Sequence, residues 1–544
     1  MSFHPKNPFL VKEKYNPLEV REEKILTLRK KKLNRISFDR IKAYEQSNTS
    51  SNIKSYEINP SELNLTNNEV IKMYYTKDKV GQLQLSLQML GNSNPYIVKF
   101  AIHGIKVFTE LLSQTEKDNI QMYIPENVFI GLLQFLIPNQ DKQILYEIAK
   151  ILIVLTYTNN FYSTLIIQNA QNFYTFILTQ KDPVLIKQLL WVLANVLGGS
   201  EALLNQALTT YQYLPDYIYG IIEKEESIYH SVEIFTIVLW IYGRFYESPL
   251  LVNNLLDNKC FVHLPIIAKF IRTQIYMTLF EEAVYAIHQF IKFLVEIKEC
   301  RKDTENAEKY NKLIKSLNLS QLLSFLKEKE SRRTKEYILK IFALLGYLED
   351  SYLIDLISNG LIQYLENILI EIEDQSDVKI DNFWWNYLML IYNMATSRKS
   401  SVTYSISRNS SICQRLIQYT MSNKFSSCKE EVMNIFSGLL DNNFEKIKTE
   451  LIVIYLPELC VQCLDEIDNP KQGDTVLFTL NCLVKLLEHG AKMMKNRNIV
   501  RDLLRQKNCK EKLEKVMIKS KNQEVIAESS MLLKTFFAES IGQI

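Results

Sequence analysis

The stretch LIKQLLWVLANVLGGS (185–200) is the strongest of a succession of apolar helical patterns that begins at about residue 70. Short polar breaks separate these patterns. When the neighbouring segments are aligned on Trp191, the intervals between equivalent positions range from 41 to 55 residues. A unit of this length cannot hide its apolar face alone, so neighbouring units are expected to stack. The equivalent positions are Lys150, Trp240, Tyr285, Lys340, Met389, Met433 and Asn481.

The length of the repeat predicts an all-α fold. Armadillo and HEAT units have periods of about 40–47 residues, and loop insertions would account for the longer intervals. With a further unit around Ile105–Leu112, we expect an armadillo-repeat right-handed superhelix of about ten repeats. The composition agrees, because Gly 14 and Pro 13 in 544 residues are few. Sheets, hairpins and propellers need many more of them at their turns.

The charge is unevenly distributed along the chain. Residues 1–46 contain twelve Lys/Arg and six Asp/Glu, a net charge of +6. The whole chain carries +3, so the remainder carries −3. Residues 18–45 have no Pro or Gly and follow Asn16-Pro17, which favours a helix. Three interpretations of this arm are a solvated charged tail, a nucleic-acid arm, and a helix that docks in an acidic protein groove.

The domain organisation follows from these composition changes. We expect a basic arm at 1–46, a polar Ser/Asn-rich linker at 47–68, a repeat solenoid at 69–540 and a short tail at 541–544. The N-terminus lacks an apolar run long enough for a signal peptide. The apolar run 234–243 is half a membrane span and predicts a buried helix, so no membrane association is expected.

The sequence offers no catalytic or metal-binding motif, and we expect no enzyme activity and no cofactor. It contains no GxxxxGK[ST], GxGxxG, HExxH or GxSxG, and its six histidines lack metal-ligand spacing. Cys460 and Cys463 form a single CxxC without a second ligand pair, so core thiols on one helix are the simpler interpretation.

At WVLANVLGGS the sequence resembles the importin-α family of armadillo adaptors. Further resemblance lies in EEKILTLRKKKLNRISFDRI (22–41), LNCLVKLLEHGAK (480–492) and KLEKVMIKSKNQEVIAESSMLLKTFF (512–537). The similarity therefore extends over the arm, the repeats and the closing helices. In that family, tryptophans on the inner helices pack against Lys and Arg stems, and asparagines four residues later bind the backbone of a cargo peptide. Stacked indoles favour cations by about 0.5–2 kcal/mol each.

The resemblance implies a cargo-peptide groove. Trp191 and Asn195 keep the full pair, whereas Arg244 follows Trp240 and Met389 precedes Asn393. Gly199 stands where the family has an acid. Each residue also has a packing interpretation, and Trp384 and Trp385 are expected to be packing residues outside the groove. The expected groove residues are Gln188, Trp191, Asn195, Trp240, Asn393 and Glu430.

The arm resembles the importin-β-binding helix of the family. The residues implied to contact importin-β are Leu28, Arg29, Lys30, Lys31, Lys32, Arg35 and Arg40. The function implied is a nuclear import adaptor that shuttles between cytoplasm and nucleus. Its partners would be importin-β, cargo proteins with basic localisation peptides and an export receptor, without direct nucleic-acid binding. The alternative is an importin-α-derived scaffold that binds other partners, such as cytoskeletal proteins; the eroded Trp/Asn pattern favours it.

Overall fold

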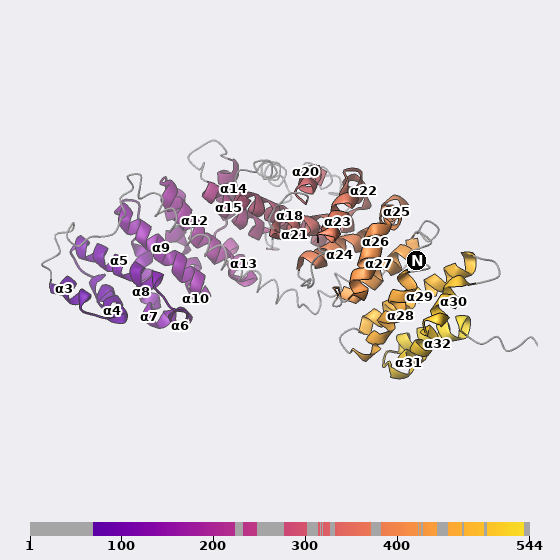
Figure 1. Cartoon of the computed structure of the whole chain (residues 1–544). Coiled ribbons are helices and arrows are strands. Elements are labelled where there is room, and N and C mark those ends of the chain that lie inside the picture. The colour runs from indigo at the N-terminus through magenta and orange to yellow at the C-terminus, as the bar shows by residue number, and fades with distance from the viewer. Residues whose placement is uncertain are drawn as a thin grey trace, which may run out of the picture. The chain divides into compact units, whose positions relative to one another are not determined.

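The computed structural model contains helices and no strands among the residues that it describes, and the all-α prediction is confirmed (Figure 1). The described residues are 69–223, 232–246, 248, 277–301, 314–315, 317, 319–326, 332–371, 382–422, 424–425, 428–442, 455–469, 473–493 and 498–537. The predicted arm and linker lie outside these ranges.

The chain divides into two compact units, Met1–Gln289 and Phe290–Ile544. The division falls within α18 (Met277–Arg301). Each unit is described by itself below.

The first unit contains thirteen described helices before α18, and several of them are short. Long helices recur after pairs of short ones, as in α10, α11 and α12 and again in α13, α14 and α15. The bounds are α3 Glu69–Tyr75, α4 Lys79–Met89, α5 Pro95–Glu110, α6 Gln114–Asp118, α7 Ile120–Tyr123, α8 Glu126–Gln134, α9 Lys142–Thr158, α10 Asn160–Gln168, α11 Ala170–Thr179, α12 Pro183–Leu197, α13 Glu201–Thr210, α14 Leu214–Glu223 and α15 Val232–Phe245, the last of which confirms the helix expected at 234–243.

The long helices of the first unit start at equivalent N-cap residues. Asn94, Asp141 and Asp182 precede α5, α9 and α12, and each side chain accepts a hydrogen bond from a backbone amide of the first turn. Such caps satisfy amides that have no partner within the helix. Proline at the first position of α5 and α12 costs no hydrogen bond there.

The four long helices α5, α9, α12 and α15 contact one another in sequence order and form a layer. The short helix α10 packs against α9 and α12, and it also contacts α8 and α13. Buried tyrosines connect the short helices. Tyr162 donates a hydrogen bond to the Ile124 carbonyl at 2.7 Å, and Tyr211 donates one to the Ile166 carbonyl at 2.9 Å. Each of these bonds joins residues roughly one repeat apart.

The second unit has the same arrangement of short and long helices. Its long helices α21, α24, α27 and α29 contact one another in order, and α32 covers α29. The bounds are α20 Leu319–Ser324, α21 Arg332–Leu348, α22 Asp350–Ser358, α23 Leu361–Ile370, α24 Asn382–Ala395, α25 Ser400–Arg408, α26 Ser410–Met421, α27 Lys429–Asn442, α28 Leu456–Cys463, η7 Leu464–Asp468, α29 Gly473–Met493, α30 Ile499–Gln506, α31 Cys509–Lys519 and α32 Gln523–Phe536.

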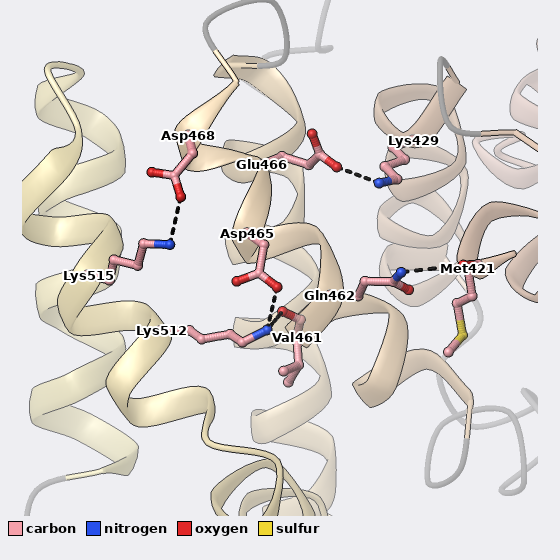
Figure 2. Close-up of polar contacts among 9 residues, drawn as sticks. All are labelled: Met421, Lys429, Val461, Gln462, Asp465, Glu466, Asp468, Lys512 and Lys515. Atoms are coloured by element: carbon pink, nitrogen blue, oxygen red, sulfur yellow. Dashed lines mark hydrogen bonds and ion pairs between the residues drawn. The ribbon is translucent and has the colours of Figure 1, made fainter. Parts of the chain in front are cut away.

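The acidic turn η7 is joined by lysines to the helices on both sides (Figure 2). Lys429 of α27 pairs with Glu466. From α31, Lys512 pairs with Asp465 at 2.6 Å and also donates to the Val461 carbonyl at 3.0 Å. Lys515 and Lys519 both reach Asp468, at 2.7 and 2.6 Å. The hydrogen bonds from these two lysines hold the pKa of Asp468 below its ordinary value.

We expect Asp468→Asn to lower the thermal unfolding midpoint at neutral pH and low salt. Because the pKa of Asp468 is lowered in the folded state, its stabilising effect is present above the unfolded pKa of about 3.9 and is lost as the pH falls through the lower folded value. The pairs are exposed, so the effect should be small and screened by salt. Asp355→Asn, at an exposed site in α22, is the control. Equal pH dependence in the wild type and Asp468→Asn would contradict the role of this carboxylate.

Candidate binding face

One side of the long helices in the first unit carries a stripe of partly exposed side chains. They recur every three or four residues, which places them along one face of each helix. We call this surface the long-helix face. It consists of Tyr96, Lys99, His103, Lys106 and Glu110 of α5, Gln143, Tyr146, Lys150, Ile153 and Tyr157 of α9, and Val184, Lys187 and Trp191 of α12.

Trp191 lies on this face. Its side chain is partly exposed, one turn after Lys187 on α12. Gln188 is buried beside it in the helix, and its Oε1 atom has no hydrogen-bond partner among the described residues. A buried acceptor without a hydrogen bond lowers the free energy of unfolding, so a donor group placed beside Gln188 would stabilise the protein.

Asn195 is only 5% exposed, and its amide group contacts the preceding long helix. Nδ2 donates to the Ile153 carbonyl at 3.1 Å and to Thr156 Oγ1 at 3.3 Å. In the second unit, Asn393 of α24 is buried and donates to the Ala343 carbonyl of α21 at 2.7 Å. Both asparagines therefore connect neighbouring long helices through a backbone carbonyl near the C-terminal end of the earlier helix.

We expect Asn195→Ala to lower the free energy of unfolding by about 1–2 kcal/mol, because the buried Ile153 carbonyl loses its donor. Urea unfolding followed by circular dichroism measures the change. The control is Asn127→Ala, at an exposed position of α8, which should be within about 0.5 kcal/mol of the wild type. If Asn195→Ala left the free energy of unfolding unchanged, the hydrogen bond from Asn195 to the Ile153 carbonyl would not stabilise the fold.

Trp240 is only 6% exposed and packs against the preceding helix end. A Cβ atom at Gly198 would lie 2.5 Å from its Cη2 atom, so only glycine allows this approach. Its Nε1 atom is buried without a hydrogen-bond partner in the described part of the chain. Arg244, one turn later, is also buried, and its Nη2 atom donates to the Leu197 carbonyl at 3.3 Å. This arrangement agrees with the packing interpretation of Trp240.

We expect Gly198→Ala to destabilise the first unit by about 1–3 kcal/mol, because the rigid indole ring cannot yield to the added methyl group. Differential scanning calorimetry measures the change. Gly220→Ala is the matched control, since a Cβ atom there meets nothing within 4 Å. Gly198→Ala should cost less stability in the Trp240→Leu background than in the wild type, because leucine leaves room for the added methyl group. Equal costs in the two backgrounds would refute the steric explanation.

The remaining predicted groove residues lie in the second unit. Glu430 is partly exposed in the first turn of α27, between the buried residues Lys429 and Glu431. Trp384 is 1% exposed and contacts Phe383, Tyr387 and Phe425 edge-on or at a tilt, which confirms its packing role. Trp385 differs from the prediction, because it is partly exposed. It lies four residues before Met389 and therefore on the same face of α24.

The ends of the long helices are joined by charged and polar pairs that sequence reasoning missed. Lys99 Nζ lies 3.3 Å from Asp141 Oδ2, and Lys142 Nζ lies 3.3 Å from Asp182 Oδ2. The Tyr146 hydroxyl donates to the same Asp182 oxygen at 2.6 Å. Burial acts to raise the pKa of Asp182, but these hydrogen bonds and that of the Leu185 amide outweigh it and lower the pKa. Asp141 and Asp182 are the N-caps of α9 and α12. An aspartate directly before a helical pattern is the sequence signal that could have indicated these pairs.

A second polar contact lies deeper between α5 and α9. His103 Nδ1 is 2.9 Å from Glu147 Oε1, and Glu147 is buried. Glu147 Oε2 has no partner among the described residues. Glu147 and Gln188 occupy equivalent positions, three residues before Lys150 and Trp191. The layer thus contains two buried oxygen atoms without donors on adjacent helices.

The described residues contain no group of three or more His, Cys, Asp or Glu side chains that could hold a metal ion. Cys460 and Cys463 are both buried on α28, which confirms their prediction as core thiols. Burial raises the pKa of the Cys463 thiol to about 12. No helix within the described ranges is both long and apolar enough to cross a membrane.

The expected importin-β contacts of the arm, from Leu28 to Arg40, lie outside the described residues. The described ranges therefore hold the predicted groove residues but not the arm.

Comparison with known proteins supports the fold alone. No family model and no curated protein matches the chain. The structure is similar to the crystal structure of an engineered protein, target OR497 of the Northeast Structural Genomics Consortium, with a TM-score of 0.64 and 12% sequence identity. The similarity covers 85% of this chain and 100% of that chain. It extends over most of the helical layers described above.

Proposed function

We propose that this protein is an armadillo-type superhelix that acts as an adaptor, resembling importin-α in organisation. The recurrence of two short helices and one long helix supports this architecture in each unit. The sequential contacts of the long helices also support it, because repeat proteins pack each unit against its neighbours in the chain. Such stacks bind partners along the face formed by equivalent helices.

The observation that carries the proposal is the long-helix face itself. It presents aromatic rings, amides and charged groups at regular intervals on three adjacent helices, with Trp191 partly exposed among them. An extended peptide fits this chemistry, because its side chains and main-chain groups meet a repeating set of partners.

The arm completes the proposed adaptor. Residues 1–46 carry +6 and would bind importin-β through Leu28, Arg29, Lys30, Lys31, Lys32, Arg35 and Arg40. The protein would then shuttle between cytoplasm and nucleus, with an export receptor returning it. This part of the proposal rests on the sequence resemblance alone.

Two partner classes are open to the long-helix face: lysine-rich localisation signals and other protein segments. The positions of the Trp/Asn pairs favour the second class. The donor groups of Asn195 and Asn393 already bond to carbonyls of the preceding helix, and Trp240 is buried. A lysine-rich peptide would therefore meet fewer free amides and indoles here than the importin-α resemblance implies.

We expect deletion of residues 1–46 to abolish capture of purified importin-β, because the basic helix supplies the attraction. The sharper variant is Arg29→Glu/Lys30→Glu/Lys31→Glu, which should lower the affinity by more than about a hundredfold through repulsion. Surface plasmon resonance on the full chain measures the change. The matched control is Lys6→Glu/Lys12→Glu/Lys14→Glu, with the same charge change outside the predicted motif. Unchanged capture of importin-β by Arg29→Glu/Lys30→Glu/Lys31→Glu would contradict the proposed importin-β-binding role of the arm.

A further inference from the structure

Charge differs between the long helices α5, α9 and α12 and five of the short helices of the first unit. The long helices α5, α9 and α12 contain five lysines and two glutamates. The sequences of the short helices α8, α10, α11, α13 and α14 contain four Asp/Glu and no Lys or Arg. The weakly acidic repeat region therefore has its excess of acid away from the face that would bind a peptide. The five lysines are Lys99, Lys106, Lys142, Lys150 and Lys187.

The second unit shows this segregation only in its first helices. The long helix α21 carries Arg332, Arg333, Lys335 and Lys340 against one glutamate, and α24 carries no charge. The short helices α22 and α23 carry Asp350, Asp355 and Glu366 without a basic residue. Elsewhere in this unit the long helix α27 carries one lysine against three acids, and the short helices α25, α26 and α31 carry more basic than acidic residues, so the segregation belongs to the first unit.

Three lysines of these long helices pair with carboxylates within the chain. Lys99 and Lys142 pair with the aspartate caps of the following helices, and Lys106 lies 3.6 Å from Glu110 on the same helix. Lys150 and Lys187 lie nearer the middle of the layer and are partly exposed. Lys150 occupies the position of Trp191 in its own helix, so the middle of the face has a lysine where the importin-α resemblance would place an indole.

The net charge also distinguishes between polyanions. Counting the caps Asp141 and Asp182, α5, α9 and α12 with their caps carry five lysines and four acids. Nucleic-acid binding commonly uses about six to ten phosphate contacts, which is a denser positive surface than this one. A short acidic protein segment needs only a few lysines at the correct spacing, and a weakly charged face with aromatic side chains suits it better.

We propose that the long-helix face of the first unit binds an acidic, extended segment of a partner protein, through Lys106, Lys150 and Lys187. Helices pack about 8–10 Å apart and an extended chain rises about 3.3 Å per residue, so about six residues cross from α5 to α12. Carboxylates two or three residues apart would meet successive lysines, and an intervening apolar residue would meet the Trp191 ring. The inference rests on the proposed adaptor function, of which it names the partner class.

The test is fluorescence anisotropy with the full chain and three labelled probes: an extended Glu/Ser peptide of about twelve residues, a Lys/Ser peptide of equal length, and a single-stranded oligonucleotide. The acidic peptide should bind best, with an affinity that falls as salt rises. Lys106→Glu/Lys150→Glu should weaken it by at least about tenfold. Lys72→Glu/Lys117→Glu, the same charge change on α3 and α6, should leave it nearly unchanged.

The milder pair Lys106→Gln/Lys150→Gln keeps the test valid if charge reversal impairs folding, and it should weaken the acidic peptide by a smaller factor. Stronger binding of the basic peptide would overturn the inference. Binding of the acidic peptide that is unchanged in both Lys106/Lys150 variants would also overturn it, because the basic arm would then be the binding site. Oligonucleotide binding that is tighter and is lost in the same variants would also overturn it. None of these outcomes uses importin-β, so capture by the arm separately tests the adaptor proposal.

Discussion

Side chains that bond to a backbone carbonyl of the preceding long helix hold the layers in register. Asn195 bonds to Ile153, Asn393 to Ala343, and Lys485 to Ser437, in both units of the chain. Apolar burial drives the helices together but is non-directional. These polar contacts specify which turn of one helix meets which turn of the next, because a shifted helix would leave buried carbonyl oxygens unsatisfied.

The same contacts limit what the long helices offer to a partner. Asn195 and Asn393 direct their Nδ2 donors at the neighbouring helix and are almost fully buried, so they offer a peptide little of their amide groups. Most of the long-helix face in the first unit consists of lysines, tyrosines and Trp191, and the rest is His103, Glu110, Gln143, Ile153 and Val184. The chemistry of the long-helix face is therefore determined by the side chains that do not take part in packing between the helices. It differs for this reason from the Trp/Asn pattern that the resemblance implies.

The helical character and the approximate unit lengths could be predicted from the sequence, because apolar periodicity directly reflects which side of a helix is buried. The same signal could not separate Trp191 from Trp240. Both follow the pattern, but Gly198 lets the Trp240 ring sink against the previous helix end, whereas Trp191 stays at the surface. Nor could it assign Trp385, which shares the face of Met389, or reveal that aspartate caps pair with lysines some forty residues earlier. These outcomes depend on contacts between neighbouring helices, and the periodicity within one helix carries no information about such contacts.

The ion pairs Lys99–Asp141 and Lys142–Asp182 join residues 42 and 40 positions apart, and the tyrosine bonds to Ile124 and Ile166 have similar separations. No long loop has to close before these contacts form, so the entropic cost of each is that of a single unit. During synthesis, each long helix of the first unit can therefore dock on the long helix before it as soon as it emerges, without waiting for the C-terminal residues. The chain can acquire its order progressively from the N-terminal side, and a truncated chain keeps the contacts of the units it contains.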